Sequence, residues 1–356
     1  MEINPIFMDR CLQLALKGEG FTKPNPLVGA VIVHCNKIIG EGYHRQYGGP
    51  HAEVNAIASV KDVSLLRDST LYVSLEPCSH HGKTPPCAQM IVSNKIPRVV
   101  LAIKDPNPAV SGKGIEIMSN NGIDVTVGIM GEEACELNKM FFVNQLFKRP
   151  FVMLKWAQSK DGFIDVIRDS IDDMAPAKIS NSFTNTVVHK FRTHAQGIIV
   201  GTKTALLDNP QLTARKWFGP HPSRIVIDRE NKIPANSALF DGSAPAIVFT
   251  ASAPAIDKDN KQVKYIEIDF TKDTNRQILS SLYNEKIYSL LVEGGTSLLN
   301  SFIEKSLWDE AYVEISDKKL FSGVKAPEIK GKTISVEKYL NSLQFHLKSE
   351  ITRNFL

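Results

Sequence analysis

One histidine and two cysteines, each beside a helix-start signal, constrain this chain more than any other feature. His51 opens the segment His-Ala-Glu, Cys78 follows Glu-Pro, and Cys87 follows Pro-Pro. Imidazole and thiolate are ligands that zinc prefers, and three protein ligands leave one tetrahedral position open for water. A purely structural zinc site usually has four protein ligands. The pattern therefore predicts an open zinc site with a catalytic role.

Glu53 stands two residues after His51, too close to be a convenient fourth ligand. One helical turn can aim its carboxylate at the bound water, where it takes a proton and returns it to a leaving group. This H-x-E…P-C…C arrangement is typical of zinc deaminases of nucleosides and nucleobases. Eight residues separate the two cysteines, where two are usual, and Lys83 is the fixed cation of this insert. We expect the insert to loop out and border the pocket.

Strand and helix signals alternate through the first part of the chain, which predicts a layered α/β domain. A helix is expected after the cap-like Asn4-Pro5, and a helix over residues 132–147 ends the domain before Lys148-Arg149-Pro150. The remaining expected elements are a hairpin with strands 28–33 and 38–43, a helix over 52–60, a strand over 70–75, a helix opening at 85–88 and a strand over 99–103.

The second part of the chain also reads as α/β. Strands are expected at 151–157, 197–200, 224–228, 246–250, 265–268 and 289–293, with a turn at 158–162, a helix at 184–194, a short turn or helix at 201–207 and an irregular loop at 208–215. The G-x-G-x-x-G fingerprint of dinucleotide-binding folds does not follow its first strand. The run Glu293-Gly294-Gly295-Thr296 leads from a strand into a helix. It is either an anion site at a helix start or a tight turn.

Length and composition bound the class of protein. The 356 residues suggest two domains, and 42 basic against 38 acidic residues give a net charge of +4 without blocks of like charge. That balance is weak support for a nucleic-acid partner. Five scattered cysteines do not form a disulfide framework, residues 1–10 lack a signal-peptide pattern, and no run of 18 apolar residues occurs. We expect a cytoplasmic enzyme without a membrane partner.

Four stretches together resemble the deaminase half of bacterial bifunctional riboflavin-biosynthesis deaminase/reductase proteins. They are residues 24–30, 51–53, 76–87 and 105–108, and the longer insert between the cysteines is that family's mark. The resemblance implies an N-terminal cytidine-deaminase-like three-layer α/β domain with one Zn2+. It implies zinc on His51, Cys78 and Cys87, Glu53 as the proton shuttle, Asn25 and His44 at the pyrimidine, and Lys83 at the phosphate of the substrate.

Four further stretches resemble the reductase half of the same family. They are residues 155–162, 201–204, 208–215 and 292–295. That half implies a dihydrofolate-reductase-like domain and NADPH, although no single residue here decides NADPH over NADH. Arg192 and Arg215 suit a phosphate because guanidinium binds it in a two-point fashion. The resemblance places Arg192, Leu212, Arg215 and Glu293 at the ribose-phosphate substrate, and Ala157, Thr204, Asp208, Gly295, Thr296, Ser297, Leu298, Leu299, Asn300 and Ser301 at NADPH.

The resemblance covers about residues 4–350 and implies two consecutive reactions on one small phosphorylated pyrimidine. Residues 1–148 would deaminate 2,5-diamino-6-(5-phosphoribosylamino)pyrimidin-4-one. Residues 149–356 would then reduce the ribosyl chain to give 5-amino-6-(5-phosphoribitylamino)uracil, in a homo-oligomer formed through the reductase domain. One departure stands out, because Lys178 occupies the place of an aromatic residue in the Trp-Ile-Ser/Thr run of many relatives.

Three other functions compete with this interpretation. A second domain that has lost hydride transfer and only scaffolds an oligomer is motivated by Lys178. A nucleic-acid-editing deaminase would need a basic, aromatic-lined groove for a flipped base, and the sequence offers none. A non-enzymatic zinc module is disfavoured by the three-ligand pattern.

Overall fold

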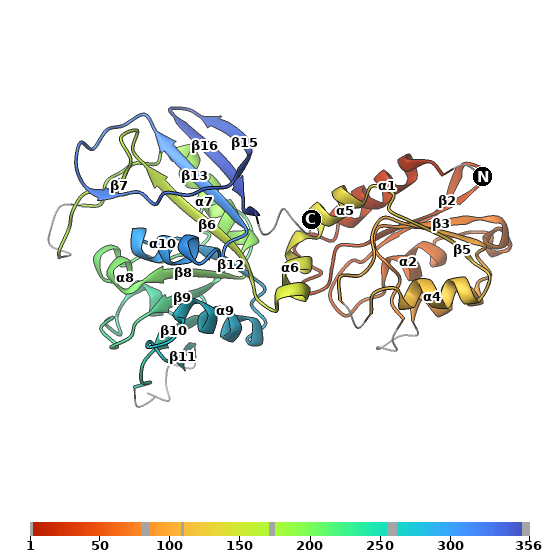
Figure 1. Cartoon of the computed structure of the whole chain (residues 1–356), viewed down its shortest axis with the longest axis horizontal. Helices are drawn as coiled ribbons and strands as arrows, with labels where there is room; N and C mark the ends of the chain where they lie inside the picture. The colour runs from red at the N-terminus through yellow and green to blue at the C-terminus, as the bar shows by residue number, and fades with distance from the viewer. Residues whose placement is uncertain (1–2, 80–85, 108–109, 171–174, 255–261, 351–356) are drawn as a thin grey trace. The chain divides into compact units, whose positions relative to one another are not determined.

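The computed structural model describes residues 3–79, 86–107, 110–170, 175–254 and 262–350 (Figure 1). The chain divides into two compact units between Phe147 and Lys148. Within the described residues, no helix combines the length and the apolar character needed to cross a membrane. All five cysteines are free thiols.

The first unit contains a five-stranded sheet in the order β2-β1-β3-β4-β5. The pairs β1–β2 and β1–β3 are antiparallel, whereas β3, β4 and β5 run parallel. Its strands are β1 (Gly29–His34), β2 (Lys37–Tyr43), β3 (Thr70–Val73), β4 (Arg98–Leu101) and β5 (Asp124–Val127). Its helices are α1 (Pro5–Leu16), α2 (Ala52–Ala58), the 3-10 helix η1 (Val63–Asp68), α3 (Cys87–Ser93), α4 (Lys113–Asn120), α5 (Gly131–Leu137) and α6 (Lys139–Phe147).

Helices cover both faces of this sheet, which makes the three layers expected of a cytidine-deaminase-like domain (Figure 1). On one face, α2, α3 and α4 bury residues such as Ala56, Ile91 and Met118 against the strands. On the other face α1 lies against β1 and β3, where the Cys11 thiol donates to the carbonyl of Tyr72 at 3.3 Å. The sheet therefore carries α2 and α3, the two helices nearest the predicted zinc ligands, on one face.

Two local predictions in this unit have different outcomes. The hairpin is confirmed, and its two-residue turn places Cys35 and Asn36 at positive φ, as a tight turn between twisted strands requires. The continuous helix predicted over residues 132–147 is wrong, because it breaks at Asn138 between α5 and α6. The Asn138 side chain accepts from the backbone N–H of Leu27 at 2.8 Å and donates to its carbonyl at 2.9 Å. This two-point contact fixes the segment before the hairpin.

The second unit is built on a nine-stranded sheet in the order β11-β10-β9-β8-β12-β6-β13-β16-β15, with a separate pair β14-β7. Its strands are β6 (Phe151–Gln158), β7 (Phe163–Asp165), β8 (Gly197–Gly201), β9 (Ser223–Ile227), β10 (Ala246–Thr250), β11 (Val263–Glu267), β12 (Ser289–Val292), β13 (Glu310–Ser316), β14 (Val324–Lys325), β15 (Lys332–Tyr339) and β16 (Ser342–Lys348). Its helices are α7 (Ser182–His194), α8 (Thr202–Asp208), the 3-10 helix η2 (Ala238–Phe240), α9 (Thr274–Asn284) and α10 (Thr296–Glu304).

The seven strands from β11 to β13 run parallel, and β16 and β15 close the sheet antiparallel. Helices α9 and α10 bury Leu282 and Phe302 against one face of the sheet. Helix α7 lies on the other face, where Phe191 contacts Tyr312 with ring centroids 4.4 Å apart. Because the strands are parallel, their carboxyl ends meet at one edge, where α/β sheets bind their ligands. The ends of β6, β8 and β12 bring the predicted cofactor residues to this edge.

Candidate functional site

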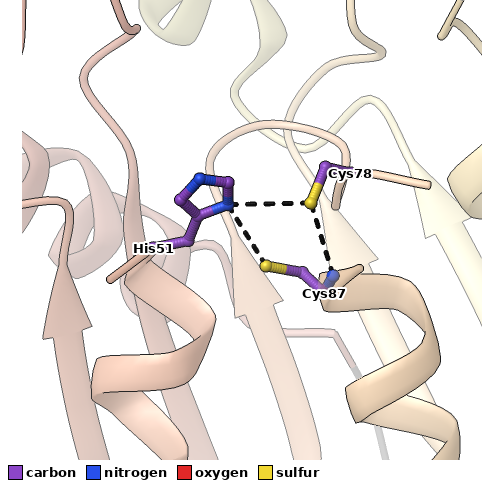
Figure 2. Close-up of side chains that lie close together, drawn as sticks. All are labelled: His51, Cys78 and Cys87. Carbon is purple, nitrogen blue, oxygen red and sulfur yellow. Dashed lines mark hydrogen bonds between the residues drawn. The ribbon is translucent and has the colours of Figure 1, made fainter. Parts of the chain in front are cut away.

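The three predicted zinc ligands come from two helix starts and one loop of the first unit. His51 is the residue before α2, Cys87 is the first residue of α3, and Cys78 lies in the loop after β3. Nδ1 of His51 is 3.3 Å from Sγ of Cys87 and 3.7 Å from Sγ of Cys78 (Figure 2). The ligand atoms all lie within 4.8 Å of one another, so one ion can bind all three. This donor set fits zinc with one open position.

The two thiols are in different states. The pKa of Cys78 is lowered, first by a hydrogen bond from the Cys87 thiol and also by His51. The pKa of Cys87 is raised, because that same hydrogen bond holds its proton. The backbone N–H of Cys87 also points at Sγ of Cys78 at 3.3 Å. Cys78 is therefore already disposed to be a thiolate, the form in which cysteine binds metal.

Glu53 lies in the first turn of α2 and is 3 % exposed. Burial raises the pKa of its carboxyl, and the Cys87 thiol is near enough to form a hydrogen bond with it. A raised pKa brings a carboxylate closer to the range in which it can both accept and release a proton at neutral pH. The structure thus places the predicted proton shuttle against one of the predicted metal ligands.

Asn25 and His44 lie together beside the metal ligands. Nδ2 of Asn25 is 3.1 Å from Nε2 of His44, and the rings of His44 and His51 meet edge-on with centroids 5.6 Å apart. Burial lowers the pKa of His44, which favours the neutral ring. The structure therefore brings together two residues predicted at the pyrimidine. Lys83, predicted at the phosphate, lies outside the described residues.

Glu76 precedes Pro77 and Cys78 and has a structural role that the sequence did not predict. Its buried carboxylate accepts from the backbone N–H groups of Asp105 and Gly112 at 3.1 and 3.0 Å, and of Gly114 and Ile115 at 3.0 and 3.4 Å. A Cβ on Gly114 would lie 2.1 Å from the carbonyl oxygen of Pro77, so only glycine allows this approach. Glu76 therefore fastens the start of α4 against the loop that carries Cys78.

In the second unit, several residues predicted at NADPH meet at the carboxyl edge of the sheet. The backbone N–H of Gly295 donates to Oγ1 of Thr204 at 3.2 Å, which joins the start of α10 to α8. Thr296, Ser297 and Asn300 share the first turns of α10. Leu298 and Leu299 point into the core, with Leu299 fully buried, so only their backbone can face a cofactor.

Two other predicted cofactor residues make side-chain contacts of their own. The hydroxyl of Ser301 donates to the carbonyl of Leu298 at 2.7 Å and accepts from the side-chain amide of Asn275 at 3.0 Å. Asp208 ends α8 and accepts from Arg168 at 2.6 Å, and Arg168 also binds Asp165. Ala157 is half-buried near the end of β6.

The four residues predicted at the ribose-phosphate are brought close together by α7, the end of β12 and the loop after α8. Arg192 donates to both carboxylate oxygens of Glu293, at 2.6 and 3.1 Å, and to the carbonyl of Thr213 at 3.1 Å. Leu212 precedes Thr213 with a positive φ of 52°, and Arg215 donates to the Thr213 hydroxyl at 3.4 Å. Burial acts to raise the pKa of Glu293, but Arg192 outweighs it and the pKa is lowered.

Sequence reasoning missed three buried titratable residues beside this group. Lys155 in β6, His189 in α7 and Glu314 in β13 are each 9 % exposed or less. Burial lowers the pKa of Lys155, and the opposing effects of Glu314 and Glu293 only partly offset this. Burial and Arg192 lower the pKa of His189 to about 4. A lysine within the apolar run Phe151-Val-Met-Leu-Lys-Trp was a signal that could have been used.

Lys178, the residue that departs from the family pattern, is exposed, and its carbonyl accepts from the Lys318 ammonium. The next two residues, Ile179 and Ser180, turn inward: Ile179 is buried and the Ser180 hydroxyl binds Glu314. The segment before α7 therefore contacts the site through Ser180.

The His-Cys-Cys cluster with a buried glutamate, on a sheet covered by helices, defines the first unit as a zinc-dependent deaminase of the cytidine-deaminase class. Residues 1–103 match the family described as the cytidine and deoxycytidylate deaminase zinc-binding region. Residues 150–321 match the RibD C-terminal domain.

Whole-length relatives agree with both matches. Riboflavin biosynthesis protein RibD of Aquifex aeolicus is 40% identical over 328 residues, covering 91% of this chain and 89% of the relative. The protein of the same name from Bacillus amyloliquefaciens is 39% identical over 346 residues, covering 95% of this chain and 91% of the relative. The crystal structure of a diaminohydroxyphosphoribosylaminopyrimidine deaminase/5-amino-6-(5-phosphoribosylamino)uracil reductase from Thermotoga maritima is 36% identical, with a TM-score of 0.84 over 97% of this chain and 98% of that one.

The chain belongs to the RibD family of bifunctional riboflavin-biosynthesis enzymes. It combines a zinc-dependent deaminase with an NADPH-dependent reductase of dihydrofolate-reductase-like fold. The predictions of family, fold class, enzyme class and cofactors are confirmed.

Proposed function

We propose that residues 1–148 deaminate 2,5-diamino-6-(5-phosphoribosylamino)pyrimidin-4-one and that residues 149–356 reduce the product to 5-amino-6-(5-phosphoribitylamino)uracil. The observation that carries the first half is the close set of His51, Cys78 and Cys87 beside the buried Glu53. The Thermotoga maritima relative is named for both activities. Membership of the family brings the same pair of reactions to this chain as a proposal.

In the deamination, His51, Cys78 and Cys87 hold zinc, which supplies activation of the attacking water when bound. Glu53 takes a proton from that water and delivers it to the ring nitrogen. It then carries a second proton to the departing ammonia, so that one oxygen replaces one nitrogen on the ring carbon. Asn25 and His44 orient the pyrimidine by hydrogen bonds, and Lys83 binds the phosphate.

In the reduction, NADPH supplies the hydride, and the residues expected to hold it are Ala157, Thr204, Asp208 and the segment 295–301. Hydride addition to C1 of the opened imine leaves an electron pair on nitrogen, which must take one proton. Lys155 is a buried lysine whose charge interacts with those of Arg192 and Glu293, so we propose that it binds the substrate beside them, and the proton comes from water or from a titratable group of this cluster. Arg192, Leu212, Arg215 and Glu293 bind the ribose-phosphate.

A two-stage assay tests this assignment. Purified protein loaded with zinc is given the phosphoribosyl diaminopyrimidine, and released ammonia is measured. NADPH is then added and its oxidation is followed at a fixed amount of deaminated product. Ammonia release without later NADPH oxidation would instead mean a scaffolding second unit, and failure to release ammonia would reject the deaminase half.

We also propose that the chain forms a homo-oligomer through its reductase unit. The face formed by α7 and the β15–β16 hairpin exposes apolar side chains, including Phe183, Val336 and Leu340. Strand β15 is an edge strand, with one side of its backbone open to pairing. Light scattering of the parent and of Val336→Glu tests this, and a parent that is monomeric at micromolar concentration would reject it. The cytoplasmic location expected from the sequence stays a prediction for cell fractionation.

A further inference from the structure

One buried arginine joins two elements of the reductase unit beside the predicted cofactor residues. The Arg168 side chain is 5 % exposed, and its Nη2 donates to Oδ1 of Asp208, the last residue of α8, at 2.6 Å. Nη2 and Nε also donate to Oδ2 of Asp165, the last residue of β7, with the Nε contact at 3.0 Å. A buried ionic bridge is weak support for stability by itself. Its place next to Asp208 therefore points to a role in the site.

Helix α8 gives this bridge its connection to the cofactor residues. Thr204 and Asp208 are four residues apart in α8, which places them on one face of the helix. Oγ1 of Thr204 accepts from the backbone N–H of Gly295 at 3.2 Å, so this face of α8 lies at the start of α10. Three residues predicted at NADPH are thus close together, and Arg168 contacts the set through Asp208.

The Asp208 carboxylate is held at one oxygen and open at the other. The hydrogen bond from Arg168 engages Oδ1, and no described residue donates to Oδ2. The side chain is 33 % exposed, so a ligand can reach the carboxylate. An ionised carboxylate accepts hydrogen bonds at both oxygens and donates none. Asp208 can therefore accept from a hydroxyl or amide of the cofactor while Arg168 holds its other oxygen.

Charge gives a second reason for an arginine at this place. NADPH is strongly anionic because of its phosphates, so an unpaired carboxylate in its site would oppose binding. Lys203, the residue before Thr204, pairs with Asp169 at 3.8 Å, and their side chains are 70 % and 90 % exposed. A pair this exposed compensates little charge. Arg168 is therefore the counter-ion that matters for Asp208.

The end of α8 also has an anchor that does not depend on Arg168. Oδ1 of Asn209 accepts from the hydroxyl of Ser237 at 2.9 Å and from the backbone N–H of Ala238 at 2.8 Å. A change at Arg168 therefore acts on the side chain and the charge of Asp208, whereas the helix keeps its course.

We propose that Arg168 is a positioning residue of the NADPH site, which cancels the charge of Asp208 and leaves Oδ2 of Asp208 free to accept a hydrogen bond from the cofactor. This inference rests on the proposed placement of Asp208 at NADPH. Arg168 lies between β7 and α7, in the same segment as Lys178, and outside the stretches that carry the family resemblance. The cofactor site of this chain thus depends on a residue that those stretches do not contain.

Arg168→Gln tests the proposal, because it removes the charge and keeps a side chain that can donate to one carboxylate. We expect the Kd for NADPH, measured by fluorescence titration without substrate, to rise at least roughly tenfold. The KM for NADPH should rise by a similar factor, whereas kcat at saturating NADPH and the rate of ammonia release should stay at parental values. A parental Kd in Arg168→Gln would overturn the proposal.

Asp165→Asn is the matched control, since it weakens the other end of the same bridge. The amide oxygen of asparagine can still accept from the backbone N–H of Ala177, as Oδ1 of Asp165 does at 2.8 Å. The contact between Arg168 and Asp208 remains, so the Kd for NADPH should match that of the parent. A rise in Kd equal to that of Arg168→Gln would show that the bridge only supports the fold.

Two further variants keep the outcome decisive. If Arg168→Gln does not fold, Arg168→Lys replaces it: an ammonium lacks the planar fork of a guanidinium, so the Kd should rise at least roughly threefold, and a parental Kd would again overturn the proposal. Asp208→Ala separates this inference from the proposed site. If Asp208→Ala binds NADPH with the parental Kd, the placement of Asp208 at the cofactor is wrong. If it binds NADPH weakly while Arg168→Gln binds as the parent does, only the role of Arg168 is overturned.

Discussion

The side-chain amide of Asn25 and the imidazole of His44 meet at 3.1 Å, and a second contact fixes which nitrogen of the ring carries the proton. Nδ1 of His44 is 3.0 Å from the carbonyl oxygen of Pro50, which can only accept, so Nδ1 donates. Nε2 is then the acceptor for the N–H of Asn25, and the lowered pKa of His44 agrees with a neutral ring.

Asn25→Asp should therefore disturb the pyrimidine site without disturbing the metal. A carboxylate cannot donate to Nε2, so the ring must either take a second proton or lose the contact. We expect KM for deamination to rise roughly tenfold or more, with zinc content unchanged, measured by steady-state ammonia release and metal analysis. Asn121→Asp, at the end of α4, is the control and should match the parent. An unchanged KM in Asn25→Asp would contradict the assignment.

Glu53→Gln tests the proton shuttle. The amide keeps the shape of the side chain and removes its ability to carry protons, so deamination should fall by about 10²–10⁴-fold while zinc stays bound. Ammonia release and metal content are measured on the same sample, with the exposed Glu133→Gln as control. Ammonia release at the parental rate would show that Glu53 is not the shuttle.

Glu76→Ala should destabilise the first unit. Four backbone N–H groups lose their acceptor, and a buried unsatisfied donor costs about 1–3 kcal/mol. Allowing for relaxation and water, we expect the free energy of unfolding of this unit to fall by about 2–4 kcal/mol, with faster loss of zinc to a chelator. Denaturant unfolding followed by zinc release is the measurement. Glu116→Ala, on the exposed side of α4, should leave both unchanged; an equal effect would rule out the fastening role.

His189 should make the second unit sensitive to mild acid. It is 2 % exposed, and burial with Arg192 lowers its pKa to about 4 from an ordinary value of 6.5. Between these two pKa values, His189 is therefore protonated in the unfolded chain but neutral in the folded chain. The contribution of neutral His189 to the free energy of unfolding is fully present above pH 6.5. It is lost as pH falls towards 4, and the loss is at most roughly 3 kcal/mol. His189→Asn should show a smaller loss between pH 7 and pH 5 in denaturant titrations; an identical loss would contradict this.

The sequence predicted the three residues that the structure brings together as a candidate zinc site, because each part of the pattern is local. His51 with Glu53, and each cysteine with its proline, stand in short motifs at helix starts, and proline and helix-dipole effects act within a few residues. The hairpin turn at Cys35 and Asn36 is local for the same reason. Alternating strands and helices were enough to predict layered α/β units.

Most of what was missed depends on partners far apart in the chain. The break at Asn138 arises from Leu27, and the pairing of Lys155 with Glu314 needs β6 and β13 to lie side by side. Strands β15 and β16 had no predicted counterpart. Both do carry apolar alternation, with Ile334 and Val336 in β15 and Leu343, Phe345 and Leu347 in β16, so this local signal was present in the sequence and was not used.

The turn after β12 has one more consequence. Glu293 accepts from Arg192 at the predicted substrate site, and Gly295, two residues later, is the residue before α10 at the predicted cofactor site. A ligand bound at the substrate site or at the cofactor site therefore contacts one end of the same three-residue turn, which runs from Glu293 to Gly295. The two predicted subsites therefore share one turn of backbone, and a substitution at Gly294 would alter both of them at once.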